Sequence, residues 1–179
     1  MRDALTDGAS SASRPNLELI DARWPNDAAR LPQPSVALAA NMLYTNDDPV
    51  GFIEAMERQA TRLCVIALAD RAPRTPDPEV WERFRGEPLA ILPGAREFVA
   101  LMSALGREFE VGTFAAPAPR QVPIDDAVRQ QGWRFGATDS EADQARLRQA
   151  YLDIYSSETV PIAGGRTYTA VVSWRPPRT

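Results

Sequence analysis

Two short, unbroken apolar runs separated by a helical stretch constrain this chain most. The runs are Val36 to Ala40 and Leu63 to Ala69. Each is too short for an ordinary helix and lacks the polar alternation of a half-exposed strand, which is typical of parallel strands covered on both faces. Between them, Asp48-Pro49 predicts a helix start, because the carboxylate can accept from the first-turn N–H groups and proline fits the first helical position. The pattern therefore indicates an α/β sheet.

The remaining elements continue this pattern. Leu17 to Ile20 is predicted as a short strand, and residues 1–16 as a disordered lead-in. After the second apolar run, we expect a short helix at 79–84, an amphipathic helix ended by Gly106, a strand at 109–114, a proline-rich linker at 115–123, two helices within 124–155 broken near Gly136, and a last strand at 166–174. Gly164-Gly165 predicts a turn that lets this last strand close the sheet as a hairpin.

Composition excludes several classes of protein. Hydrophobic residues make up 44% and charged residues 25%, as in an ordinary globular domain. The net charge of −4 argues against nucleic acid and anionic lipid as partners. The longest apolar run is far shorter than the roughly 20 residues of a membrane-spanning helix, and the first residues lack the apolar core of a signal peptide. We therefore expect no membrane association and a cytoplasmic location.

Two residue types narrow the chemistry further. The sequence contains no histidine, so Ser-His-Asp, Cys-His and histidine-based zinc sites are excluded within this chain. Its one cysteine, Cys64, lies inside an apolar run, where a thiol usually behaves as a small buried hydrophobic group. We therefore predict no metal site and no disulfide.

Several segments carry a resemblance to a known family. Leu17 to Ile20 is followed by Asp21-Ala22, Ser35 to Tyr44 is followed by Asp48-Pro49, and Arg62 to Asp70 comes next. These segments are similar to the third, fourth and fifth strands of class I S-adenosylmethionine-dependent methyltransferases, and the strands at 105–111 and 168–174 resemble the sixth and seventh. The resemblance implies a Rossmann-like sheet of strands 3 to 7 in residues 17–179. It also implies helical layers and an antiparallel last strand. The strand order of the complete family sheet is 3-2-1-4-5-7-6.

The resemblance implies a cofactor site at the ends of two strands. Asp21 or Ala22 would contact the adenine ring of S-adenosylmethionine. Ala40 and Asn41 would face its methionine half, and Met42 or Leu43 would lie on the adenine side. Two alternatives stay open: Asp21 as a solvated carboxylate at a strand end, and Asn41 as a residue that bonds its own backbone in the turn.

The predicted substrate pocket consists of Tyr44, Asp70, Trp81 and Phe84. Asp70 follows a strand at the sheet edge where α/β folds bind ligands, and it could act as a base or orient a substrate. A salt bridge to Arg71 or Arg74 is the alternative, and ordinary core contacts are the alternative for the aromatic residues. The helical segment 123–158 is predicted as a lid over the reacting centre or as a cover for the sheet.

One part of the family pattern is absent from the sequence. The first strand, its glycine-rich turn and a second strand with a ribose-binding carboxylate should all precede Leu17, and no G-x-G-x-x-G motif occurs. We therefore expect the 179-residue chain to be inactive alone. We also expect Val36 to Ala40 to form an unpaired edge, so that the chain is poorly soluble, dimerises along this edge or accepts Leu17 to Ile20 there.

The sequence thus predicts a methyltransferase that acts on a small molecule, in which a heteroatom of the substrate attacks the sulfonium methyl group in line. Such catalysis depends largely on proximity and orientation, so it does not require histidine. The alternative is a non-catalytic α/β remnant or binding module that uses its exposed edge. A nicotinamide-dependent oxidoreductase fragment is disfavoured by the closing hairpin.

Overall fold

The computed structural model describes residues 18, 20–73, 75–138, 140–162 and 166–177. The chain divides into two units, residues 1–32 and 33–179. In the first unit, the short 3-10 helix η1 (Ala28–Arg30) is the regular element among the described residues. Glu18 and Ile20 are not in a strand, so the strand predicted at 17–20 is wrong at these two positions. A strand persists only where a neighbour pairs with it, and neither described sheet includes this segment. Leu17, Leu19 and the predicted lead-in lie outside the described residues.

The predicted strand–helix–strand unit opens the second unit. It consists of β1 (Val36–Ala40), α2 (Pro49–Gln59) and β2 (Leu63–Ala69). The two strands pair in parallel, with Val36 opposite Leu63. Asp48 Oδ1 accepts from the Gly51 backbone N–H at 2.8 Å, and Pro49 is the first helical residue. The predicted helix start is therefore confirmed.

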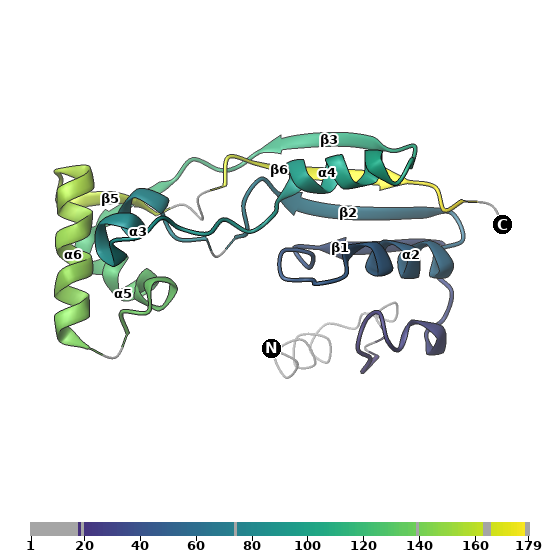
Figure 1. Ribbon diagram of the computed structural model, residues 1–179, viewed down its shortest axis with the longest axis horizontal. Helices are drawn as coiled ribbons and strands as arrows, with labels where there is room; N and C mark the ends of the chain where they lie inside the picture. Colours follow the sequence, from purple (N-terminus) through teal and green to yellow (C-terminus); the bar gives the residue numbers. More distant parts are fainter. Residues whose placement is uncertain (1–17, 19, 74, 139, 163–165, 178–179) are drawn as a thin grey trace. The chain divides into compact units, whose positions relative to one another are not determined.

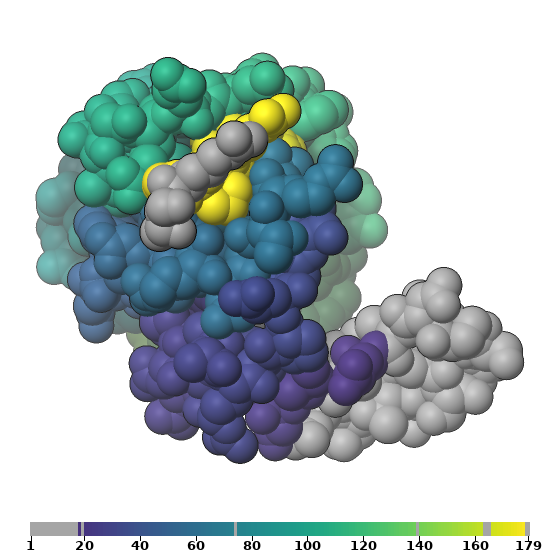
Figure 2. Space-filling view, turned by 90° about the vertical axis from the view of Figure 1, so that its right-hand side faces the viewer, coloured from purple at the N-terminus to yellow at the C-terminus, as the bar shows by residue number. Residues whose placement is uncertain are grey.

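The main sheet has four strands in the order β1-β2-β6-β3 (Figure 1). After β2 come α3 (Pro78–Arg85), α4 (Ala95–Ala104) and β3 (Glu110–Ala115). The last strand, β6 (Tyr168–Trp174), is inserted between β2 and β3 and runs antiparallel to both. In Figure 2 this strand, in yellow, lies between the blue segment that contains β2 and the green segment that contains β3.

The antiparallel direction of the last strand is thus confirmed, but the predicted hairpin is wrong in its connection. Of the two strands that pair antiparallel with β6, β3 is the nearer in sequence, and residues 116–167 separate it from β6. The strand nearest before it in sequence, β5 (Thr159–Ile162), belongs to a different sheet. Gly164-Gly165, the predicted turn, lies outside the described residues. The chain therefore mixes parallel and antiparallel pairing in one α/β sheet.

Helices α2 and α4 cover one face of this sheet. Phe98 of α4 packs on Trp174 of β6, with ring centroids 6.5 Å apart, and Trp174 Nε1 donates to Glu57 Oε1 of α2 at 2.9 Å. Glu57 also accepts hydrogen bonds from Nε and Nη2 of Arg107, at 2.8 and 2.9 Å, and these bonds connect α2 to the turn after α4. On the covered face Cys64, Ile66 and Val172 are almost completely buried.

The expectation that β1 is covered on both faces is wrong. Ala39 is buried, whereas Val36 is 48% and Leu38 is 68% exposed. Successive side chains of a strand point to opposite faces, so only one set of β1 side chains lies under the helices. The strand is also the outermost one of the sheet, and among the described residues it pairs with β2 alone.

The remaining elements form a second group, which we call the helical lobe. It contains α3, β4 (Arg120–Pro123), α5 (Ile124–Phe135), α6 (Glu141–Tyr155) and β5. The two helices predicted within 124–155 are confirmed, and Gly136 separates them in the left-handed conformation, with φ 68°. The linker predicted at 115–123 is wrong at its end, because β4 pairs antiparallel with β5. Within the described part of the chain, no helix has the length and apolar character needed to cross a membrane.

Candidate functional site

A cavity of about 540 Å³ lies beyond the carboxyl ends of β1 and β2. The loop from β1 to α2, the end of β2 and the first turns of α4 form its walls. Its volume is in the range that holds a small organic ligand, and this is the part of an open α/β sheet where ligands bind. The apolar residues and the tyrosine that line it are Leu43, Tyr44, Leu68, Leu92, Phe98 and Leu101.

Tyr44 joins the ends of the two parallel strands at this cavity. Its hydroxyl accepts from the Ala69 backbone N–H at 2.6 Å and donates to Asn41 Oδ1 at 3.1 Å. Burial raises the pKa of Tyr44, so the hydroxyl stays protonated and can donate. The loop that leaves β1 is thereby held at the level where β2 ends.

Asn41 makes the turn that leaves β1. Its φ of 55° is left-handed, a conformation that asparagine adopts more readily than other side-chain-bearing residues. Its backbone N–H still donates to Ala67 O at 2.9 Å, so the turn begins directly at the end of the parallel ladder. The side chain accepts a hydrogen bond from the hydroxyl of Tyr44 rather than bonding its own backbone. Asn41 is exposed, as are Ala40 and Met42, its neighbours among the predicted cofactor contacts.

Gly94 permits the close approach of α4 to the end of β2. A Cβ atom placed on Gly94 would lie 2.1 Å from the Asp70 carbonyl oxygen, which no side chain can accommodate. Glu97 closes the first turn of the helix by accepting from the Gly94 backbone N–H at 2.8 Å. Hydrogen bonds from the backbone N–H groups of Gly94 and Glu97 lower the pKa of this carboxyl group. The floor of the cavity is therefore set by backbone contact.

Asp70 holds the first residues of β6 against the end of β2. Its carboxylate accepts from the Thr167 backbone N–H at 2.9 Å and from Thr167 Oγ1 at 2.7 Å. Burial favours the neutral acid, but hydrogen bonds from Thr167 and Tyr168 outweigh it and lower the pKa of Asp70. A carboxylate that is already hydrogen-bonded and has a lowered pKa is a weak base. The geometry thus favours a positioning role over the predicted base. The partners of Asp70 are the Thr167 hydroxyl and backbone N–H groups, that of Arg71 among them, rather than the Arg71 guanidinium. Arg74, the other predicted salt-bridge partner, lies outside the described residues.

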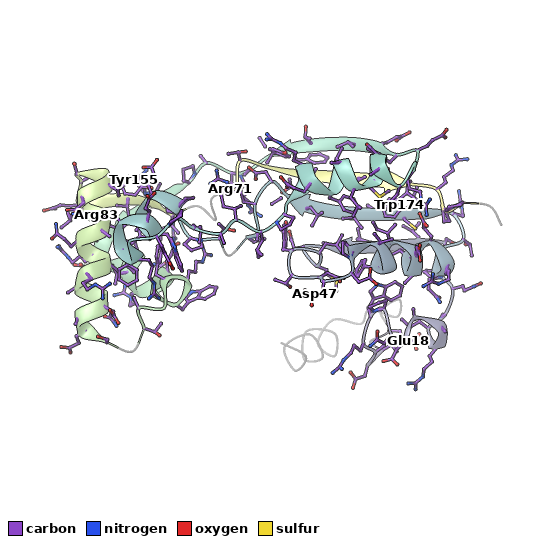
Figure 3. The ribbon with its side chains drawn as sticks, in the orientation of Figure 1. Glu18, Asp47, Arg71, Arg83, Tyr155 and Trp174 are labelled. Atoms are coloured by element: carbon purple, nitrogen blue, oxygen red, sulfur yellow. The ribbon has the colours of Figure 1, made fainter. Side chains whose placement is uncertain are left out.

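A second cavity of about 500 Å³ surrounds Asp70 and adjoins the first, because Leu92, Pro93 and Glu97 line both. Arg71 and Arg96 also line it and bring two positive charges to this side. Figure 3 labels Arg71, which directly follows the end of β2 and Asp70 in the chain. The combined site has an apolar part beside Tyr44 and a charged part beside Asp70.

The structure brings six of the ten predicted site residues to this region. Ala40, Asn41, Met42, Leu43, Tyr44 and Asp70 all lie at the carboxyl ends of the two parallel strands. Asp21 and Ala22 belong to the unit of residues 1–32, where both are exposed. Their predicted contact with the adenine ring stays a prediction.

Trp81 and Phe84 lie in a different environment from the one predicted. Their rings pack on Phe135 of α5, with centroid distances of 6.2 and 6.1 Å, and Phe84 is only 5% exposed. They belong to the core of the helical lobe together with Tyr151 of α6. The helical face of α3 was readable from the sequence, but the surface that it meets was not. Ordinary core contacts, the alternative interpretation, describe these two residues.

Gly94, Glu97 and Thr167 were not predicted for the site. Pro93-Gly94 followed by Glu97 is a recognisable helix start, so two of these residues had a signal in the sequence. Thr167 had none, because its partner Asp70 is 97 residues away in the chain.

The described residues offer no cluster of three or more acidic, cysteine or histidine side chains that could hold a metal ion. In comparisons with known proteins, no protein-family model matches the sequence and no curated protein matches it significantly.

Proposed function

We propose that the chain is part of an S-adenosylmethionine-dependent methyltransferase domain that acts on a small molecule. The observation that carries the proposal is the strand order β1-β2-β6-β3, with the last strand antiparallel between two parallel ones. This order corresponds to strands 4-5-7-6 of the class I methyltransferase order. Dinucleotide-binding sheets commonly run parallel to their end, so the inserted antiparallel strand favours the methyltransferase.

The position of the cavity supports a small-molecule substrate. Its apolar part, formed by Leu43, Leu68 and Phe98, would hold the body of the acceptor and exclude water. Arg71 and Arg96 would face a polar or anionic end of the acceptor in the adjoining cavity. S-adenosylmethionine would supply an activated methyl group. The contribution of this chain would be to orient the acceptor, and such orientation accounts for a large share of catalysis in a direct transfer.

The described residues fit one part of a cofactor site. Asn41 is held by Tyr44 at the end of β1, where this exposed residue and the neighbouring Met42 would border a ligand. The sequence contains no G-x-G-x-x-G motif to receive the methionine end of the cofactor. We therefore expect the 179-residue chain to bind S-adenosylhomocysteine too weakly for calorimetry and to transfer no methyl group by itself.

A nuclear magnetic resonance titration tests the proposal at the weak affinities that it predicts. The ¹⁵N-labelled chain is titrated with S-adenosylhomocysteine to millimolar concentration, and separately with nicotinamide adenine dinucleotide. We expect shift changes confined to the amides of residues 40–46 with the first ligand, and a reduced response in Asn41→Ala. Thr113→Ala, on the far strand of the sheet, is the control and should respond as the unmodified chain does.

The outcomes separate the alternatives. Larger shifts at residues 40–46 with the dinucleotide would favour the oxidoreductase fragment. The absence of any shift with either ligand would favour the non-catalytic binding module. Micromolar binding of S-adenosylhomocysteine in calorimetry would show that the expectation of an incomplete cofactor site is wrong.

A further inference from the structure

The register of the main sheet defines two faces of very different exposure. Residues that are paired across neighbouring strands point to the same face, and Leu38 pairs with Val65, Val65 with Ser173, and Ser173 with Glu110. In β2 and β6 the alternate set, which includes Cys64 and Val172, is buried under α2 and α4, whereas β3 is exposed on both faces. We call the other side the open face. Its residues are Val36, Leu38, Ala40, Leu63, Val65, Ala67, Thr169, Val171, Ser173, Glu110, Gly112 and Phe114. Ala69 has the same register but is completely buried.

The handedness of the chain explains why one face is left uncovered. The crossover from β1 through α2 to β2 and the crossover from β2 through α4 to β3 both advance in the same direction along the sheet. Crossovers between parallel strands are almost always right-handed, so both helices fall on the same side. The described strands and helices of this sheet therefore supply a cover for one face only.

The open face is apolar and carries little charge. Leu38 is 68% and Phe114 is 62% exposed, at opposite margins of the sheet, and Val65 and Val171 between them are partly exposed. Glu110, at the end of β3, is the one charged residue among the strand residues of this face. Two copies that each carry a net charge of −4 could therefore meet here with little repulsion at the contact.

We propose that two copies of this chain associate through the open face, sheet against sheet. Four strands about 4.8 Å apart and about six residues long at about 3.3 Å per residue give a footprint of about 380 Å² per copy. The total for two copies is about 760 Å² before the relief of the side chains is counted, which is below the range of stable interfaces and within that of weak, transient ones. The dimer is therefore weak, with a dissociation constant on the order of 10–100 µM.

Face contact is favoured over pairing of the β1 edges. The Asn41 backbone N–H and the Ser35 carbonyl form hydrogen bonds with β2. The N–H and C=O groups of Val36, Leu38 and Ala40 therefore point away from β2, toward the free edge of the sheet. This edge is only five residues long and follows closely after Pro34, whereas the open face extends over all four strands. The inference does not depend on the proposed methyltransferase function.

Analytical ultracentrifugation of the full chain from about 2 to 300 µM, which brackets the expected dissociation constant, tests the proposal. We expect a monomer–dimer equilibrium that Leu38→Glu and Phe114→Glu each weaken by at least about tenfold, because a buried carboxylate would have no partner. Both positions are exposed, so the fold should tolerate the changes, which near-ultraviolet circular dichroism checks. Val111→Glu is the matched control. Val111 is apolar, 44% exposed and on β3, but it points to the opposite face.

Four results would overturn the proposal. These are a monomer at every concentration, a dimer that both face variants leave unchanged, an equal loss of dimer in Val111→Glu, and assembly beyond the dimer. Hydrogen exchange distinguishes the edge from the face. In a face dimer the amides of Val36, Leu38 and Ala40 exchange rapidly, and their protection at dimer concentrations would show edge pairing instead.

Discussion

The hydroxyl of Tyr44 is the most informative single group to remove. Tyr44→Phe keeps the ring that fills the space at the end of β1 and deletes only the oxygen between Ala69 N and Asn41 Oδ1. Ala69 is completely buried, so its N–H would lose its acceptor without gaining water. We expect the variant to fold with the same topology and lower stability.

The size of the stability loss depends on which of the two former partners, the Ala69 N–H or Asn41 Oδ1, can bond water instead. A buried donor left without an acceptor costs about 1–3 kcal/mol. Asn41 is exposed, and its amide oxygen can bond water instead, so its loss adds little. The expected decrease in the free energy of unfolding is therefore about 1–3 kcal/mol, and the amide of Ala69 should exchange faster with solvent.

Urea denaturation followed by near-ultraviolet circular dichroism measures the stability, and hydrogen exchange measures the Ala69 amide. Tyr168→Phe is the matched control, because the structure shows no partner for that hydroxyl among the described residues. It should change the free energy of unfolding by less than about 0.5 kcal/mol. The reasoning is refuted if Tyr44→Phe equals the control in stability, or if exchange at Ala69 is unchanged.

Three further predictions follow from the same region. Gly94→Ala should cost at least about 2 kcal/mol in urea denaturation, because its Cβ would clash with the Asp70 carbonyl, whereas Gly86→Ala, with open space around it, should cost only about 1 kcal/mol for its positive φ. Because its pKa is lower in the folded chain, Asp70 stabilises the fold above the unfolded pKa of about 3.9. Stability curves of Asp70→Asn and the unmodified chain should therefore converge as the pH falls below about 4, and a constant difference at acid pH would contradict this. Burial raises the pKa of Cys64 to about 12, so iodoacetamide at pH 8 should label the thiol only after unfolding, as intact mass shows.

Local patterns were sufficient for most individual elements. Asp48-Pro49 and Gly136 act within one or two turns of chain, so a helix start and a helix break could be read from the residues alone. The short strands β4 and β5 could not. Each has four residues and includes a proline, and each exists because it pairs with the other across α5 and α6.

The candidate site divides in the same way. The continuous apolar runs and the turn residues after them identified the region around Asn41, Tyr44 and Asp70. What these residues do depends on partners that are distant in sequence, since Tyr44 bonds Ala69 and Asp70 bonds Thr167. Trp81 and Phe84 show the same limit, because the apolar side of α3 was evident while its neighbour Phe135 was not.

Two apolar runs, one helix start and a set of glycine and proline positions were enough to specify strands, helices and an α/β sheet, because these depend on neighbours within a few residues. Folding in three dimensions decided which strands are adjacent, that the last one is inserted antiparallel, and that both crossover helices lie on one face. It also created the cavity beside Tyr44 and left Leu38 and Phe114 exposed. The physical reason is that pairing, close approach and burial are set by contacts between distant segments, which alternation of residues along one strand does not encode.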